Sequence, residues 1–295
     1  MIMPRQIPDI AVIGAGVSGL ACADRLAENG FQVQVHDKGQ QPGGRVATSH
    51  RMGLDFEIGA PGQRDLITRL ARRAPITNNS RITQLERTVD GNWRLYQDGQ
   101  PLRGIYTGVV VAMPAPQAAA LVGFAPDLVA RLDEVVMNPV MTALIGLPGP
   151  LGRGWDHIRF GDATLEEARR QQRHPPGGPE GWVLHGSPIF SRDNLECDPH
   201  AVAQHLWLRF SDALDMSNPA PIYLRGHRWR YGRVDTPLGQ PCLHDDTLGL
   251  GICGDWCLDD GVEAAEASGR ALAARILGIP ERPVRKTLAA REGLA

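Results

Sequence analysis

A glycine-rich turn between an apolar strand and a helix constrains this chain more than any other feature of its sequence. The run 10–13 has the composition of a buried strand, and Gly14, Gly16 and Gly19 follow it at once. An Ala- and Leu-rich helical segment comes next, and a second strand is predicted at 31–35. This order predicts the opening unit of a dinucleotide-binding domain.

Each glycine of the motif has its own task in such a site. Gly14 makes the tight turn, Gly16 lets the backbone approach a pyrophosphate, and Gly19 lets the helix pack on the strand. The helix N-terminus offers free N–H groups and a partial positive charge to the phosphates. Asp37 ends the second strand, where a carboxylate suits a ribose hydroxyl.

The composition excludes several classes of partner. A formal net charge of −2 over 295 residues gives no electrostatic basis for binding nucleic acid or an anionic membrane. No apolar run approaches the ~20 residues of a membrane span, and segment 1–5 is too short for a signal peptide. The five irregularly spaced cysteines favour free thiols in a reducing compartment. We therefore expect a cytoplasmic protein that binds neither nucleic acid nor membrane.

Short strands and helices alternate along the rest of the chain. Strands are predicted at 80–85, 93–96 and 105–107 as a meander, and at 109–113, 139–147, 182–185, 222–224 and 248–253. Helices are predicted at 66–73, 117–122 and 128–135, between the capping box Thr164-x-x-Glu167 and Arg173, after the cap Asp198, and at 262–277.

A strand, a Gly-Asp pair and a helix close the chain, so both ends carry parts of a nucleotide site. We therefore expect an α/β protein with a discontinuous nucleotide-binding domain and a substrate domain inserted into it. The predicted nucleotide-binding domain comprises 1–62, 76–114 and 225–295. The predicted substrate domain comprises 63–75 and 115–224.

Three further features favour FAD over NAD as the dinucleotide. The Gly-Gly-Arg turn 43–45 adds a guanidinium that can bind phosphate through two hydrogen bonds. The Gly-Asp pair 254–255 places a carboxylate where a ribityl chain or a ribose needs an acceptor. A helix expected to begin at 261–265 would direct its N–H groups and dipole at one point, where they would stabilise negative charge on a reduced flavin.

This order of motifs resembles the FAD-dependent amine oxidase superfamily, most closely its renalase branch, over nearly the whole chain. The motifs that carry the resemblance are Gly14–Gly19, Asp37-Lys38, 43–45, 109–116, 182–198, His227–Tyr231, 253–256, Val262-Glu263 and Ser268-Gly269. It implies a glutathione-reductase-like FAD-binding fold, with a parallel sheet plus β-meander and an inserted, reduced α+β substrate domain. It also implies noncovalent FAD, a small electron-rich substrate and reoxidation by oxygen to hydrogen peroxide. Renalases proper act on dihydro isomers of NAD(P)H.

The resemblance also implies roles for individual residues. Those expected to bind FAD are Gly14, Gly16, Gly19, Asp37, Lys38, Gly44, Arg45, Ile82, Gly254, Asp255, Val262 and Glu263. The residues expected on the substrate side of the isoalloxazine are Trp229, Trp256, His227 and His185.

The chain departs from its renalase relatives after Gly59-Ala60. There the renalases continue with a Gln-Tyr pair and a long segment that covers the flavin, whereas this chain has a Pro-Gly pair and one short predicted helix. A binding pocket normally buries ~70–90% of a small ligand. A shortened cover predicts a more open flavin, a larger or carrier-bound substrate, or a partner that supplies a lid.

The remaining residues narrow the chemistry. Amine oxidation often uses a lysine near the flavin, but Lys38 lies beside the ribose acid and Lys286 near the end of the sequence. Their positions count against a typical monoamine or polyamine oxidase. A disulfide reductase would need a second glycine motif and a redox cysteine pair, and no metal site is predicted. His227 fits either the edge of an active site or a structural hydrogen bond, and the structural role is slightly favoured.

Three hypotheses follow. The first is a renalase-like FAD-dependent oxidase or dehydrogenase that takes a hydride from a dihydropyridine or cyclic amine onto flavin N5. The second is a flavin-dependent tailoring enzyme for a larger intermediate, either free or presented by a carrier or partner protein. The third is a non-catalytic FAD-binding subunit that docks a partner.

Overall fold

The computed structural model describes residues 10–51, 53–57, 63–152, 154–171, 178–216 and 220–279. Its helices are α1 (Val17–Glu28), α2 (Gln63–Leu70), α3 (Ala115–Leu121), α4 (Pro126–Leu132), α5 (Pro188–Asp193), α6 (Pro199–Ala213) and α7 (Val262–Leu277), with 3-10 turns η1 (Gly44–Val46) and η2 (Asp255–Cys257). Its strands are β1 (Ile10–Ile13), β2 (Val33–His36), β3 (Thr48–Arg51), β4 (Leu54–Glu57), β5 (Ile76–Thr77), β6 (Ile82–Arg87), β7 (Trp93–Gln97), β8 (Gln100–Pro101), β9 (Gly108–Val111), β10 (Val136–Leu147), β11 (His157–Arg159), β12 (Leu165–Arg170), β13 (Glu180–Gly186), β14 (Tyr223–Thr236), β15 (Leu243–Asp245) and β16 (Leu250–Ile252).

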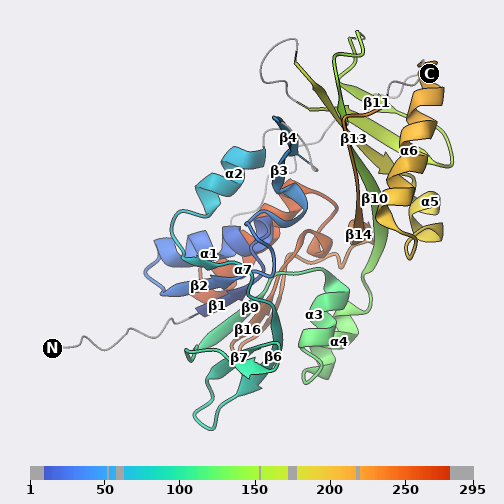
Figure 1. The fold of residues 1–295 in the computed structure, drawn as a ribbon. Helices are drawn as coiled ribbons and strands as arrows, with labels where there is room; N and C mark the ends of the chain where they lie inside the picture. Colours follow the sequence, from blue (N-terminus) through green and yellow to red (C-terminus); the bar gives the residue numbers. More distant parts are fainter. Residues whose placement is uncertain are drawn as a thin grey trace.

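The first sheet brings together segments from distant parts of the sequence. Its strand order is β15-β16-β9-β1-β2-β5, parallel throughout except for β15. Every residue of β1, β9 and β16 is buried, as expected for strands covered on both faces. Helices α1 and α7 pack on one face, and the meander β6-β7-β8 with α3 and α4 covers the other (Figure 1). This is the expected parallel sheet with a β-meander.

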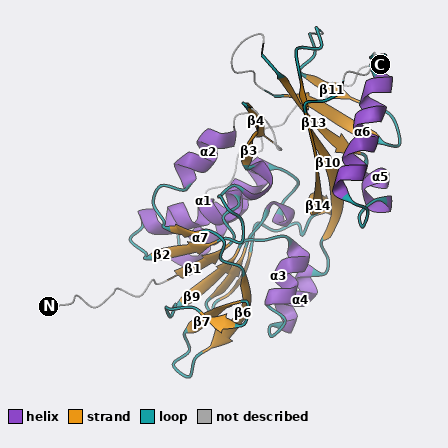
Figure 2. Cartoon of the chain, viewed as in Figure 1, coloured by secondary structure: helices purple, strands orange, loops and turns teal. Residues whose placement is uncertain are grey.

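The second sheet is antiparallel, with strand order β11-β12-β13-β10-β14. Alternate residues of β10, including Met141, Ala143 and Ile145, pack with α5 and α6 in one hydrophobic cluster. Figure 2 shows both helices on the same side of this sheet. Residues of the opposite alternation therefore face away from the helices. They face the unit formed by the first sheet with its helices and meander, which we call the first body. The hairpin β3-β4 packs against part of that face through Leu54 and Phe56.

Two segments predicted to belong to the substrate domain contribute to the cores of the first sheet. Ile67 and Leu70 of α2 pack in the cluster that holds α1. The chain then returns to the edge of the first sheet through β5, which pairs with β2. Ala118 of α3 and Leu132 of α4 pack in the cluster beneath the meander.

Some local predictions were wrong. A helix was predicted from the supposed capping box Thr164-x-x-Glu167 to near Arg173, but β12 occupies 165–170. Residues 172–177, at the end of that prediction, lie outside the described part of the chain. Pairing with β13 and burial of Leu165 and Ala168 outweigh the helical sequence pattern. Segment 105–107 is no strand either, although Tyr106 forms one bridge to Trp93.

Two helices begin where the sequence predicts them. Helix α7 has the predicted limits, and α6 follows the cap Asp198, whose Oδ1 accepts a hydrogen bond of 2.9 Å from the Ala201 N–H. No helix in the described part of the chain is long and apolar enough to cross a bilayer.

Candidate active site

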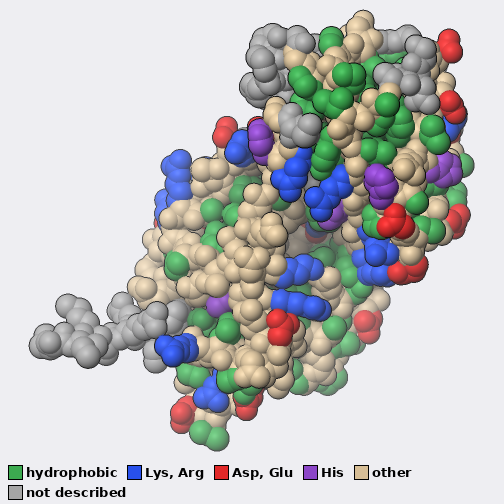
Figure 3. Space-filling view, in the orientation of Figure 1, with side chains coloured by type: hydrophobic (Ala, Val, Ile, Leu, Met, Phe, Trp, Pro, Cys, Tyr) green, Lys and Arg blue, Asp and Glu red, His purple; other side chains and the backbone are tan. Residues whose placement is uncertain are grey.

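A large cleft separates the first body from the second sheet. Its volume is about 2240 Å³, and its lining includes the glycine turn, η1, the start of α7 and the exposed face of the second sheet. Figure 3 shows basic side chains (Lys or Arg) and histidines gathered around the hollow between the two bodies. Ligand pockets for small molecules usually measure about 300–1,000 Å³, so this cleft has room for a dinucleotide and a second molecule.

The glycine turn leaves open the space that a pyrophosphate would need. A Cβ on Gly14 would lie 2.2 Å from the Ala112 carbonyl oxygen, and φ of Gly14 is +108°. A Cβ on Gly19 would lie 2.0 Å from the Gly14 carbonyl oxygen. At Gly16, which lines the cleft, a Cβ would meet nothing within 4 Å. Gly14 and Gly19 are thus required by the fold, whereas Gly16 keeps its backbone accessible to a ligand.

Asp37 fixes the shape of this turn. Its Oδ2 accepts a 2.6 Å hydrogen bond from the Ala15 N–H, and its Oδ1 accepts one of 2.6 Å from the Gly39 N–H. Asp37 and Lys38 both line the cleft where β2 ends, and Ile82 lines it from the start of β6. The carboxylate therefore lies where the sequence predicts a ribose contact, and it also holds the loop around it.

A buried polar network supports this end of the cleft. His36 Nδ1 lies 3.1 Å from Ser80 Oγ, and its Nε2 lies 3.1 Å from the Tyr106 hydroxyl. Burial lowers the pKa of His36 to about 4, so the ring is neutral near pH 7. The network ties β2 to the chain that enters β6.

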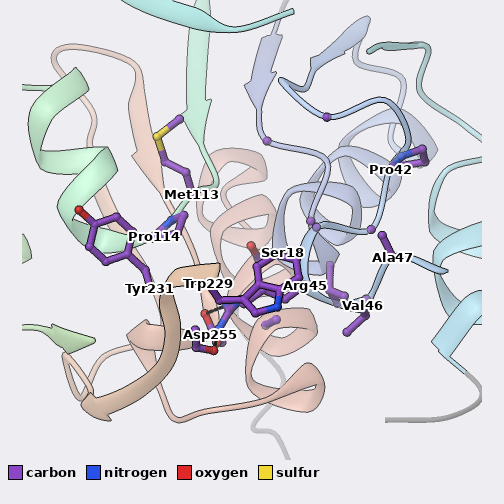
Figure 4. Close-up of a pocket in the computed structure, with 18 of the residues that line it drawn as sticks. Ser18, Pro42, Arg45, Val46, Ala47, Met113, Pro114, Trp229, Tyr231 and Asp255 are labelled. Atoms are coloured by element: carbon purple, nitrogen blue, oxygen red, sulfur yellow. Dashed lines mark hydrogen bonds and ion pairs between the residues drawn. The ribbon is translucent and has the colours of Figure 1, made fainter. Parts of the chain in front are cut away.

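Arg45 and Asp255 meet across the two distant parts of the sequence. Arg45 Nη2 lies 2.6 Å from Asp255 Oδ1, and Nη1 donates a 3.1 Å hydrogen bond to the Gly232 carbonyl. The side chain of Asp255 is 3% exposed and that of Arg45 is 33% exposed. The arginine is therefore the member of the ion pair that a ligand in the cleft can reach. Figure 4 shows Arg45 and Asp255 beside Ser18 and Trp229.

Two helix N-termini open into the cleft near this pair. Gly16 caps α1, and Gly261, with φ of +122°, caps α7. Gly16, Val262 and Glu263 line the cleft, and Gly254 is held by a 3.1 Å hydrogen bond from its N–H to Ser268 Oγ. Each N-terminus supplies backbone donors and partial positive charge to an anionic ligand. Gly44, in η1, also lines the cleft.

A polar row crosses four strands of the second sheet and faces the first body. Glu167 pairs with His185, His185 with Thr142, and Thr142 with His227. His185 Nδ1 lies 3.2 Å from Thr142 Oγ1. Burial and the nearby charge of Arg225 lower the pKa of His227. His185 and His227 thus lie together on the cleft wall.

The two tryptophans expected near the flavin have different environments. Trp229 lines the cleft, and its ring centroid lies 4.1 Å from that of His227. Trp256 also reaches the cleft, but it is fully buried in the core beneath the meander. Its indole N–H donates a 3.0 Å hydrogen bond to the Met113 carbonyl. Trp229 therefore lines the cleft on the side of the second sheet, whereas Trp256 belongs mainly to the hydrophobic core beneath the meander.

Several charged residues of the cleft were absent from the sequence prediction, among them Glu166, Arg233 and Asp260. Arg233 donates to Glu166 Oε1 at 2.7 Å, and the Val234 N–H donates to Asp260 Oδ1 at 3.1 Å. No local pattern marks these residues, because irregular strand pairing and long-range contacts place them in the cleft. For Glu166 the apparent capping box also gave a misleading helical signal.

Most of the cysteines in the described part of the chain are buried. None of the five is in a disulfide bond, and Cys22, Cys253 and Cys257 are buried. Burial raises the pKa of Cys257 to about 12, which disfavours a nucleophilic thiolate. No group of three or more potential protein ligands for a metal occurs among the described residues.

Comparisons with known proteins agree with this architecture. Residues 12–66 match the model of the NAD(P)-binding Rossmann-like domain family. Fifty residues are 50% identical to a 4,4'-diapophytoene desaturase of Staphylococcus haemolyticus (strain JCSC1435) and 52% identical to a zeta-carotene-forming phytoene desaturase of Myxococcus xanthus. Each alignment covers 17% of this chain and only 10% of the relative.

Solved structures resemble nearly the whole chain. A structure described as a protoporphyrinogen oxidase from Exiguobacterium sp. 255-15 is 13% identical, with a TM-score of 0.69 and coverage of 92% of this chain and 99% of that one. Cyclohexylamine oxidase from Brevibacterium oxydans IH-35A is 11% identical, with a TM-score of 0.67 and coverage of 92% and 99%. These similarities show a shared α/β fold with a Rossmann-like dinucleotide-binding domain.

Proposed function

We propose that this chain is an FAD-dependent oxidoreductase of the amine oxidase and desaturase type, acting on a small electron-rich donor. FAD would accept a hydride from a dihydropyridine or cyclic amine at flavin N5 and be reoxidised by oxygen, with release of hydrogen peroxide. The observation that carries the proposal is the meeting of the glycine turn, Arg45, Asp255 and the start of α7 in one cleft. Similarity to amine oxidase structures supports the same cofactor.

The cleft residues fit FAD by the chemistry of their donors and acceptors. The open backbone at Gly16 and the N-terminus of α1 suit the pyrophosphate, and Arg45 adds a cation beside them. Asp37 and Asp255 supply carboxylates for sugar and ribityl hydroxyls. The N-terminus of α7 would stabilise negative charge on the flavin.

The second sheet would orient the substrate in this site. Trp229 offers an aromatic surface and an indole donor, while His185 and His227 add imidazole groups on the same wall of the cleft. Oxidation of a dihydropyridine gives an aromatic cation and needs little acid–base assistance. The main work of these residues would be to position the donor and exclude water.

Gly16→Ala tests the cofactor site directly. The purified wild-type protein should carry FAD, measured by its visible absorbance and by release of the dinucleotide on denaturation. Gly16→Ala should weaken FAD binding at least about tenfold, because the new methyl group fills the space left for the pyrophosphate. A wild-type protein that binds no FAD, or a variant with unchanged affinity, would contradict the assignment.

A renalase-like reaction can be tested separately. Anaerobic mixing of the FAD-loaded protein with dihydro isomers of NAD(P)H should abolish the visible flavin band, and oxygen should restore it with formation of hydrogen peroxide. If the band persists with every isomer, the renalase-like assignment fails while the FAD assignment stands.

The cleft volume favours a second candidate function, the tailoring of a larger intermediate presented free, on a carrier protein or by a partner. A cleft of about 2240 Å³ exceeds a usual small-ligand pocket even when part of it holds a dinucleotide. Turnover of carrier-bound intermediates but not of the corresponding free small molecules would favour this function. The third candidate, a non-catalytic FAD-binding subunit, would be rejected by multiple turnovers of any substrate by the purified chain alone.

A further inference from the structure

A β-bulge turns an additional carboxylate toward the cleft. In the pairing of β12 with β13, Leu165 lies opposite Gly186 and Glu167 opposite His185, which leaves Glu166 as an extra residue. Adjacent side chains of a regular strand point to opposite faces. The bulge changes that alternation, and Glu166 and Glu167 both line the cleft.

The two adjacent carboxylates have different surroundings. Glu167 receives hydrogen bonds from Arg169, and its Oε2 lies 2.9 Å from His157 Nε2. Burial would raise the pKa of Glu167, but the hydrogen bonds from Arg169 and His157 outweigh that effect and lower it to about 2. Glu166 accepts a hydrogen bond of 2.7 Å from Arg233 at Oε1, whereas its Oε2 is buried without a hydrogen-bond partner.

Trp229 has a hydrogen-bond donor without a partner, the counterpart of the unpaired acceptor of Glu166. Its Nε1 is buried without a hydrogen-bond partner, although the ring packs on His227. Buried donors and acceptors in folded proteins nearly always have partners. Glu166 on β12 therefore has one unpaired buried acceptor and Trp229 on β14 one unpaired buried donor, and both residues line the cleft.

We propose that Glu166 and Trp229 are specificity-determining residues for a polar substrate. Glu166 binds an N–H or O–H donor of that substrate, and Trp229 donates to a carbonyl or another acceptor. This assignment rests on the proposed function, because it describes the substrate side of the same cleft. A pure hydrocarbon would leave both protein groups unpaired, and a site built for hydrogen bonding rejects a ligand that lacks the matching group.

Matched probes can test this assignment on the FAD-loaded protein. Benzylamine and ethylbenzene compare a donor with an apolar group, and acetophenone and isopropenylbenzene compare an acceptor with an apolar group. Dissociation constants can be measured by perturbation of the flavin spectrum and by ligand-observed NMR. The wild-type protein should bind the polar member of each pair at least about tenfold more tightly.

Two conservative variants should change these preferences in different ways. Glu166→Gln keeps an acceptor for Arg233 but can place an NH₂ donor where Oε2 lies, so it should lose the preference for benzylamine and gain affinity for acetophenone. Trp229→Phe should lose only the preference for acetophenone. Glu134→Gln, an exposed change at a carboxylate paired with Arg131, should match the wild type.

The outcomes separate this inference from the proposed cofactor. Equal affinities within both pairs for the wild type, including no binding by any probe, would overturn it. Unchanged preferences in Glu166→Gln and Trp229→Phe would also overturn it. FAD content measured on the same samples tests the cofactor independently, and the NMR comparison can be made on protein without FAD.

Discussion

At the scale of single residues, the glycines of the turn have two different roles. Gly14 is required by the fold, whereas Gly16 leaves space for a ligand. A Cβ at Gly14 would collide with the Ala112 carbonyl, while one at Gly16 would enter open space. Gly14→Ala should therefore lower the free energy of unfolding of the cofactor-free protein by at least about 2 kcal/mol, from overpacking and a disfavoured φ. Gly16→Ala should change it by less than about 0.5 kcal/mol. Urea unfolding measures both, and equal losses would contradict the distinction.

His36 should give the protein a measurable dependence of stability on pH. Its folded-state pKa of about 4 lies below the unfolded value of about 6.5, so the unfolded chain binds the proton more readily. The contribution is constant above about pH 6.5, and stability falls by about 2 kcal/mol between pH 6.5 and pH 4.5. Urea unfolding across this range should show a shallower decline in His36→Gln than in wild type. The exposed change His200→Gln should keep the wild-type slope, and an unchanged slope in His36→Gln would refute the prediction.

Among the elements, β14 carries an irregularity that joins the second sheet to the cofactor loop. Its pairing with β10 shifts between Asn138 and Val140, which lie opposite Arg233 and Trp229 respectively. Within this stretch, the Gly232 carbonyl accepts the hydrogen bond from Arg45. The bulge thus connects the substrate wall to the proposed phosphate-binding arginine.

Gly232→Ala should disturb this connection. The new Cβ would lie 2.7 Å from a methyl carbon of Val140, and such overpacking costs about 1–3 kcal/mol. We expect a lower melting temperature and weaker retention of FAD, measured by thermal unfolding and equilibrium dialysis. Gly154→Ala, where a Cβ meets nothing within 4 Å, should show neither effect. Loss of stability with normal FAD affinity would mean that the Gly232 contact does not support the cofactor site.

The sequence predicted the elements whose signals are local. The glycine turn, the cap Asp198 and the limits of α7 depend on neighbouring residues, and the structure reproduces them. The strand β12 was missed because its burial depends on pairing with β13. Glu166 could not be predicted as a cleft residue for the same reason, since a bulge is a property of two strands.

At the scale of the whole molecule, FAD should stabilise segments that are distant in sequence. Its proposed site draws on the glycine turn near the first strand and on Asp255 with the start of α7. A ligand present at about 100 times its dissociation constant adds about 2.7 kcal/mol of stability if it binds only the folded state. The melting temperature should rise by about 5 °C with FAD, while the same concentration of NAD should leave it unchanged. An equal rise with both dinucleotides would contradict selectivity for FAD.

The packing of α1 against α7 also has a consequence for how the chain folds. These helices share a core across more than two thirds of the sequence, and β9 lies between β1 and β16 in the sheet. Contacts between these helices can form only after a long stretch of chain has closed into a loop, which costs conformational entropy. We therefore expect the nucleotide site to form late and folding to be slow. During synthesis, the early strands must wait with an exposed edge until β16 and α7 emerge, which makes the nascent chain prone to aggregation. Cofactor capture would then follow completion of the sheet rather than guide its first steps.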